Sequence, residues 1–224
     1  MVLRKHYFLI TFIITMILFI SGIFVGIRLD IAKSDDIHDR YRQTELDWYD
    51  IQLQTEYYQV YPVENECDVS IQNNLAFADK VYLRGQEIER YEAQQKVFLE
   101  LQQDKVEYGL LKFQFWLNAV RIRDVCDANY VTVMYFYKDV PTGVEEIQQN
   151  AMSSILFDLK QELGSDMVLV PLAIDLNVDS IDLLTSELGI TTVPSISINE
   201  ELVLNGVISE RQVKTHIKDY QTAV

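Results

Sequence analysis

The sequence predicts an α/β domain at the carboxyl-terminal end of the chain, preceded by a helical region and a membrane anchor. Three observations lead to this class. Residues 131–220 alternate strand-like and helix-like segments in the order β-α-β-α-β-β-α. Residues 65–126 contain no proline and only two glycines, as long helices do. Residues 7–27 are uncharged and mostly apolar. These observations divide the chain into a membrane anchor, a juxtamembrane helix, a helical hairpin and an α/β domain, at residues 1–29, 30–62, 63–127 and 128–224.

The charge of the chain excludes several classes of partner. The net charge is −15, and only the first 29 residues carry an excess of basic side chains. Such acidity argues against nucleic acid, whose phosphates require Lys and Arg, and against docking on an anionic lipid surface. The three histidines are scattered, and neither cysteine lies in a CxxC motif. The sequence therefore predicts no metal site and no cofactor.

The membrane anchor is predicted from the length and the flanks of residues 7–27. At a rise of about 1.5 Å per residue this run spans about 30 Å, the thickness of a bilayer core. No small-x-small cleavage site follows it, so we expect an uncleaved, single-pass signal-anchor. Arg4, Lys5 and the amino terminus favour a cytoplasmic N-terminus and an extracytoplasmic C-terminal domain. Gly22 and Gly26 have the GxxxG spacing that lets membrane helices approach each other.

Residues 30–61 are predicted to form one helix that ends before Pro62. One face of this helix carries residues spaced alternately by four and three, namely Ile37, Tyr41, Thr44, Trp48, Ile51, Thr55 and Tyr58. This face needs a partner, which is either the following helices or another copy of the chain. A homo-oligomer through the helical region is therefore one open possibility.

Residues 65–126 are predicted to form an antiparallel helical hairpin with coiled-coil character. One stripe consists of Ile71, Leu75, Ala78 and Tyr82. A second has heptad spacing and consists of Leu99, Val106, Phe113 and Val120, with Leu110 and Leu117 between them. A turn near residues 94–96 gives arms of equal length and brings Cys67 and Cys126 together. We favour a disulfide between them, worth about 2–4 kcal/mol. Two buried thiols or an exchanging redox pair are the alternatives.

The α/β domain begins with two apolar runs that are typical of buried strands, at residues 131–137 and 167–174. A turn at 138–143 precedes a helix over 144–163, and Gly164 ends that helix. The helical spacing in this segment is carried by Ile147, Ala151, Ile155 and Leu159. A strand–helix–strand unit of this length is parallel and right-handed.

The rest of the domain is predicted from turn and capping signals. Asp179 is expected to cap a short helix that ends at Gly189. Ile196 and Ile198 alternate with serines in a third strand, and a turn at 200–201 leads to a fourth strand at 202–204. Ser209 and Gln212 have the spacing of a capping box for the last helix. The third and fourth strands are expected to form a hairpin.

This element order, with Thr192-Val193-Pro194 directly before the third strand, resembles the thioredoxin-like superfamily. The resemblance covers about the last 90 residues. It implies a cis peptide at Pro194 that faces the active-site loop, and it implies that the residue before the proline, Val193, binds extended peptides through its main chain. It also implies a Cys-x-x-Cys at the start of the first helix. The residues at that position include Val140, Pro141 and Thr142, and neither cysteine is present.

The functional prediction follows from the absence of these two cysteines at the start of the first helix of the domain. Disulfide exchange requires a thiolate and a resolving thiol, and Thr142 has no histidine base near it in the sequence. We therefore predict no catalytic residue, and a binding module rather than an enzyme. The expected function is that of a membrane-anchored, extracytoplasmic, redox-inactive module that binds a protein or an extended peptide between residues 140–142 and 193–194. The alternatives are a thiol-disulfide oxidoreductase that uses Cys67 and Cys126, and a structural, self-associating stalk.

Overall fold

The computed structural model describes residues 2–60, 65–94 and 101–222, and it divides the chain into the units Met1–Gln43 and Thr44–Val224. Helix α1 contributes to both units. The elements are α1 (Val2–Val60), α2 (Glu66–Gln94), α3 (Leu101–Cys126), β1 (Val131–Tyr137), α4 (Gly143–Leu163), a 3₁₀ turn η1 (Gly164–Asp166), β2 (Met167–Ala173), α5 (Asp179–Glu187), β3 (Ser195–Ile198), β4 (Leu202–Asn205) and α6 (Glu210–Thr222). The described residues thus form a mostly helical chain with one small sheet.

The first unit contains the apolar helix. Within the described residues, the segment Ile10–Arg28 of α1 is long and apolar enough to cross a membrane, with a mean hydropathy of 2.6. Its large apolar side chains are exposed, for example Phe19 at 66%. Apolar side chains exposed along a whole segment are those that a bilayer would cover. The orientation of this segment stays a prediction.

The sheet of the second unit has four strands in the order β2-β1-β3-β4. Strands β1 and β2 are parallel, and their register pairs Val131 with Met167 and Tyr137 with Ala173. Strand β3 is antiparallel to β1, and β4 is antiparallel to β3. The predicted parallel pair and the predicted hairpin are therefore both present in one mixed sheet.

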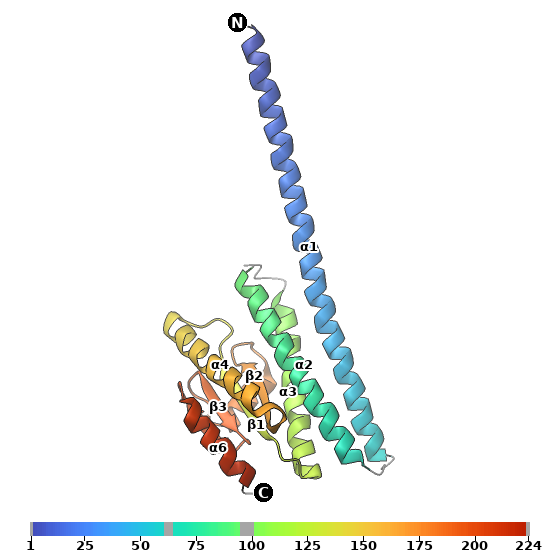
Figure 1. The fold of residues 1–224 in the computed structure, drawn as a ribbon, viewed down its shortest axis with the longest axis vertical. Coiled ribbons are helices and arrows are strands. Elements are labelled where there is room, and N and C mark those ends of the chain that lie inside the picture. The colour runs from blue at the N-terminus through green and yellow to red at the C-terminus, as the bar shows by residue number, and fades with distance from the viewer. Residues whose placement is uncertain (1, 61–64, 95–100, 223–224) are drawn as a thin grey trace. The chain divides into compact units, whose positions relative to one another are not determined.

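Helices cover both faces of this sheet. Alternate residues of β1, such as Val133 and Tyr135, belong to one buried core with Leu156 of α4 and Val213 of α6. Figure 1 shows α4 and α6 on this side of the strands. The intervening residues of β1 point to the other face, as the pleat of a strand requires. There α3 contacts both β1 and β2, and it is linked to the sheet by the hydrogen bond from Arg123 to Thr132.

Helices α2 and α3 are antiparallel neighbours. The Tyr108 hydroxyl donates to the Val81 carbonyl at 2.5 Å, and nearer the other end Asn118 donates to Asn74 at 3.2 Å. Helix α2 also contacts α4 through an ion pair between Asp79 of α2 and Lys160 of α4 at 2.9 Å. The helical pair and the sheet thus contact each other inside one compact unit, Thr44–Val224.

The end of α1 packs on this pair through three aromatic rings. The indole ring of Trp48 is 2% exposed, and its centroid lies 5.5 Å from that of Phe77 and 6.3 Å from that of Phe115. The Trp48 Nε1 donates to the Gln114 side chain at 2.9 Å. Of the face predicted for residues 30–61, Trp48 is therefore directed to the chain's own helices, and Ile51 is half-buried. The side chains of Ile37, Tyr41, Thr44, Thr55 and Tyr58 lie outside those that the structure describes.

The heptad stripe predicted for α3 is not its principal buried face. Leu117 is 48% exposed, and Phe113 is only half-buried. The buried apolar residues are instead Tyr108, Leu111, Phe115, Trp116, Ala119 and Ile122. The physical reason is that α3 contacts α2 on one side and the sheet on another, so its buried residues form a broad surface rather than a two-helix seam. Leu99 and the predicted turn at 95–96 lie outside the described residues.

Two details of the predicted helices need correction. In α4 the buried residues include Met152, Leu156 and Leu159, whereas Ile147 is 72% exposed. The short helix α5 ends at Glu187, and its N-cap position is occupied by Val178 rather than Asp179. The capping interaction predicted for α6 is present, since the Gln212 side chain accepts from the Ser209 main-chain amide at 3.3 Å.

Candidate functional site

The loops at one end of the sheet meet because of the strand directions. Strands β1 and β2 are parallel and end opposite each other at Tyr137 and Ala173, and β3 begins at Ser195 opposite Phe136. Pro194, one residue before Ser195, therefore lies beside the end of β1. Three segments gather at this end of the sheet, and we call them the loop edge: residues 138–142, 174–178 and 191–194.

An acidic side chain from the second loop fixes the backbone of the first. The Asp175 carboxylate accepts hydrogen bonds from the main-chain amides of Asp139 at 2.7 Å and Val140 at 3.0 Å. The Asp139 carboxylate in turn forms an ion pair with Lys105 of α3 at 2.8 Å, and both side chains are less than one-fifth exposed. The loop therefore has a defined conformation, and these two amides are not available to an anionic ligand.

A second set of polar contacts fixes the start of α4. The Glu145 carboxylate accepts from the Thr142 amide at 2.9 Å and from the Thr142 hydroxyl at 2.7 Å. The ammonium group of Lys138 lies 2.6 Å from the same carboxylate. The hydrogen bond from Lys138, followed by those from Thr142, lowers the pKa of Glu145 from its usual value near 4.5 to about 2. Because the Thr142 hydroxyl donates to the Glu145 carboxylate, this hydroxyl is fixed in the capping interaction at the start of α4.

The segment before β3 has main-chain groups, among them those of Val193, that form no hydrogen bond with any described residue. The Pro194 carbonyl accepts from the Gly206 amide at 2.7 Å, and the Ser195 hydroxyl donates to the Thr192 carbonyl. Val193 between them is half-buried, and its main chain forms no hydrogen bond with any described residue. The Val193–Pro194 peptide is cis. An amide and a carbonyl at the loop edge thus remain for hydrogen bonds with another chain.

Exposed apolar side chains lie in the loop after β1 and on helix α4, which follows this loop. Val140 is 58% exposed, Val144 is 70% exposed and Ile147 is 72% exposed. Val144 and Ile147 are three residues apart on α4, so they share one side of the helix. An exposed apolar group of this kind is more often found where another molecule binds.

The structure places the five predicted binding residues as follows. Val140, Pro141 and Thr142 form the loop after β1, and Val193 and Pro194 precede β3 at the same end of the sheet. Val140 and Thr142 are exposed, Pro141 and Val193 are half-buried, and Pro194 is buried. Asp175, Lys105 and the role of Glu145 were not predicted from the sequence. Asp175 had a signal, because it follows the second parallel strand and the carboxyl ends of parallel strands meet.

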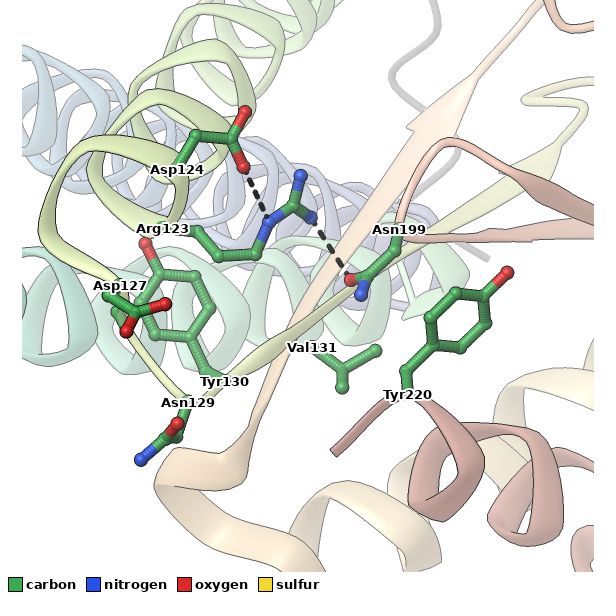
Figure 2. Close-up of a pocket in the computed structure, with 9 residues that line it drawn as sticks. Arg123, Asp124, Asp127, Asn129, Tyr130, Val131, Asn199 and Tyr220 are labelled. Carbon is green, nitrogen blue, oxygen red and sulfur yellow. Dashed lines mark hydrogen bonds and ion pairs between the residues drawn. The ribbon is translucent and has the colours of Figure 1, made fainter. Parts of the chain in front are cut away.

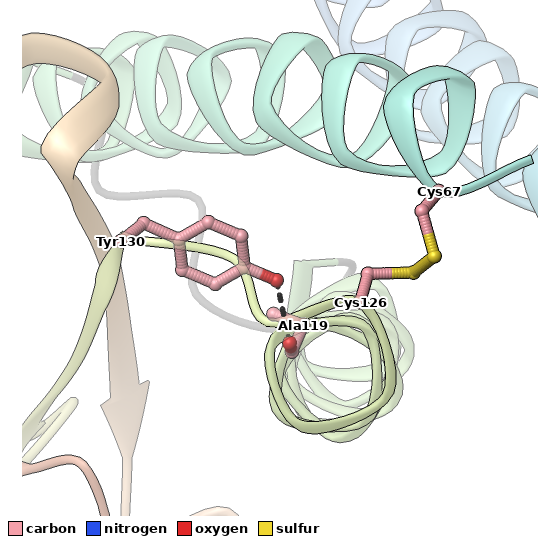
Figure 3. The surroundings of a disulfide bond; sticks show 4 residues. All are labelled: Cys67, Ala119, Cys126 and Tyr130. Atoms are coloured by element: carbon pink, nitrogen blue, oxygen red, sulfur yellow. Dashed lines mark hydrogen bonds between the residues drawn. A yellow bond between two sulfur atoms is a disulfide. The ribbon is translucent and has the colours of Figure 1, made fainter. Parts of the chain in front are cut away.

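The two cysteines of the chain lie elsewhere. Cys67 at the start of α2 and Cys126 at the end of α3 are joined by a disulfide with a Cα–Cα distance of 5.3 Å. Figure 3 shows this bond near Tyr130, whose hydroxyl donates to the Ala119 carbonyl at 2.6 Å. Both cysteines of the chain are in this bond. The described residues contain no group of three or more His, Cys, Asp or Glu side chains that could hold a metal ion.

A pocket of about 170 Å³ lies at the opposite end of β1 from the loop edge. Its lining includes Asp124, Asp127, Tyr130, Asn199 and Tyr220, as Figure 2 shows. Burial raises the pKa of Tyr130 and of Tyr220, and the nearby charges of Glu201 and Glu200 raise that of Tyr220 further. Both phenols therefore stay protonated at neutral pH and cannot act as bases there.

Arg123 joins this pocket to the sheet. Its guanidinium donates to Asn199 at 3.0 Å and to Glu200 at 2.8 Å, and it forms an ion pair with Asp124 at 3.0 Å. Burial lowers the pKa of Arg123, but hydrogen bonds and charges of Glu200 and Asp124 outweigh burial and raise it overall. The guanidinium is thus occupied by groups of the protein itself, so its role here is to hold α3 against the β3–β4 turn.

The comparisons with known proteins add little to this geometry. No family model matches the chain, and no curated protein matches it. One solved structure, described as "Structure of a malarial protein", is 18% identical to this chain and covers 41% of it and 97% of its own length. Its TM-score of 0.31 is too low to support an argument about fold or function.

Proposed function

We propose that this protein is a membrane-anchored binding module whose carboxyl-terminal domain is thioredoxin-like but has no redox chemistry. In this proposal the loop edge binds an extended segment of another protein. The amino terminus is cytoplasmic, and the unit Thr44–Val224 functions outside the cytoplasm. The helix Ile10–Arg28 provides the anchor.

The arrangement of the strands supports the thioredoxin-like part of the proposal. The parallel β1–α4–β2 unit and the antiparallel β3–β4 hairpin follow the element order on which the resemblance rests. The proline that precedes β3 lies at the end of β1, next to the loop where the superfamily has its cysteines.

The chemistry of the loop edge supports the absence of redox activity. Residues 138–142 contain no cysteine, and both cysteines of the chain are bonded to each other at the ends of α2 and α3. Asp175 and Glu145 occupy the loop amides and the Thr142 hydroxyl. A nucleophile for disulfide exchange is therefore missing from the position where this fold would need it.

One observation carries the binding proposal, namely that the Val193 main chain forms no hydrogen bond with a described residue and lies at the same end of the sheet as exposed apolar side chains. Extended peptides are recognised through main-chain hydrogen bonds, while pockets for alternate side chains give specificity. Val193 supplies the main-chain groups, and Val140, Val144 and Ile147 supply an apolar surface. The partner segment is therefore expected to be extended and to carry aliphatic side chains.

The proposal is tested with the full chain in lipid nanodiscs and peptides selected on it from a random phage-displayed library. Val193→Pro removes the main-chain donor, whereas Val193→Ala keeps it. The loss of one hydrogen bond is worth about 0.5–1.5 kcal/mol, so we expect the Kd to rise about 3- to 10-fold in V193P. In V193A the Kd should change less than about twofold.

A second pair of variants tests the apolar surface. Ile147→Asp should raise the Kd of the same peptides, because it places a charge on the apolar surface to which they are expected to bind. Leu183→Asp is the matched control, since Leu183 is 63% exposed on α5. Equal affinity of wild type, V193P and I147D, or failure to select any peptide, would overturn the proposal. Circular dichroism establishes that each variant is folded.

A further inference from the structure

The end of α1 has a second apolar face that does not point to the chain's own core. Four exposed residues form this face, which we call the outer stripe: Leu46 (55% exposed), Tyr49 (51%), Leu53 (64%) and Tyr57 (55%). Trp48, which is 2% exposed, marks the inner face. The outer stripe is separate from the loop edge, so the inference drawn from it does not depend on the proposed function.

The spacing of the outer stripe places it on one side of the helix. Its members follow one another at intervals of three, four and four residues, so at about 100° per residue they lie within an arc of about 80°. Trp48 is two residues after Leu46 and therefore points about 200° away. The stripe runs for about 17 Å along the helix axis. A contiguous apolar stripe of this length on an exposed helix is a typical docking surface for a second helix.

The charges around the stripe determine the kind of partner that fits. Residues 44–60 carry four acidic side chains and no basic one. Asp47 forms an ion pair with Lys80 of α2, whereas Asp50 and Glu56 are exposed on opposite flanks of the stripe. A second copy of α1 would bring its own acidic flanks against these, and like charges beside a helix–helix seam are unfavourable. An anionic lipid surface is disfavoured for the same reason.

We propose that the outer stripe binds an amphipathic helix of a partner protein whose apolar face is flanked by Lys or Arg. Leu46 and Leu53 supply the apolar contact, and Asp50 and Glu56 pair with the basic flanks. The rings of Tyr49 and Tyr57 favour arginine, because guanidinium groups stack on aromatic rings. Binding is expected to weaken as the salt concentration rises.

The test uses the full chain in zwitterionic nanodiscs and two designed amphipathic peptides as probes. Both peptides have leucine at heptad positions a and d, and they carry either arginine or glutamate at e and g. Fluorescence anisotropy should give at least tenfold tighter binding of the arginine peptide. Leu53→Glu should weaken that binding at least tenfold, and Leu183→Glu on α5 is the control that should leave it unchanged.

A charge-reversal variant keeps the test valid if L53E is poorly folded. Asp50→Lys with Glu56→Lys leaves the leucines in place and should reverse the preference of the chain from the arginine peptide to the glutamate peptide. Equal binding of the two peptides by the wild type, or an unchanged preference in the charge-reversal variant, would overturn the proposal. Self-association of the wild type that is abolished by L53E would also overturn it, because the occupant would then be a second copy of the chain.

Discussion

The Glu145 carboxylate joins the loop after β1 to the first turn of α4. Its pKa is lowered to about 2 by Lys138 and Thr142, so folding stabilises its charged form. This contribution to stability is complete above the usual pKa near 4.5 and is lost as the pH falls from there to about 2. We therefore expect Glu145→Gln to lower the urea midpoint at pH 7, and the difference from wild type to shrink across that acidic window.

The neighbouring residue supplies the control for this prediction. Glu146 is exposed in the same helical turn, and Glu146→Gln removes a charge there while leaving the contacts of Glu145 with Lys138 and Thr142 in place, so its urea midpoint at pH 7 should stay close to that of the wild type. Lys138→Met should raise the pKa of Glu145, which NMR of the labelled carboxyl carbon measures directly. A pKa of Glu145 near 4.5 in the wild type would contradict the described contacts.

At the scale of single residues, the sequence indicates which side chains take part in local contacts, but it does not predict their partners in other elements. Glu145 lies in the first turn of α4, where it caps Thr142 and pairs with Lys138. The capping spacing of Thr142 and Glu145 was visible in the sequence, as it was for Ser209 and Gln212. The pair of Lys105 and Asp139 was not, because the two residues come from different elements that only the tertiary fold brings together.

At the scale of elements, two glycines of the helical pair have opposite environments. A Cβ at Gly109 of α3 would lie 2.7 Å from the Leu176 Cδ1, which is too close. A Cβ at Gly85 of α2 would lie 3.7 Å from the Tyr108 hydroxyl, which is an ordinary contact. Gly109→Ala should therefore be less stable than Gly85→Ala, by up to about 1–3 kcal/mol, because the buried end of the Leu176 side chain must move aside. Gly85→Ala should be neutral or stabilise by about 0.5–1 kcal/mol, because alanine favours a helix.

Urea unfolding of the two variants in detergent micelles measures this difference. Wild-type stability in both variants would contradict the close packing of α3 against the segment around Leu176. Each variant is the control for the other, because both substitutions add one methyl group to a helix.

The elements themselves were largely predictable, and their surroundings were not. The strands at 131–137 and 167–173 follow from apolar, β-branched runs, and the parallel pairing follows from the helix between them. The heptads of α3 were misleading, because α3 contacts both α2 and the sheet. The same limit applies to Ile147, whose helical spacing is genuine but whose side chain is exposed at the loop edge.

At the scale of the whole molecule, the disulfide reports the side of the membrane on which the second unit lies. It joins residues 59 positions apart and is expected to stabilise the fold by about 2–4 kcal/mol. Disulfides persist outside the cytoplasm and are rare within it. In freshly alkylated cells the wild type should therefore migrate faster without reductant, and Cys67→Ser should abolish this shift. A fully reduced wild type would contradict the proposed orientation.

The measurement that tests the central claim most directly is hydrogen–deuterium exchange of the full chain in nanodiscs, with and without a selected peptide. We expect slower exchange at residues 191–193 and 138–140, together with unchanged exchange at the pocket around Asn129 and Tyr130. Protection confined to that pocket or to residues 44–60, with none at Val193, would contradict the claim that the loop edge is the binding site.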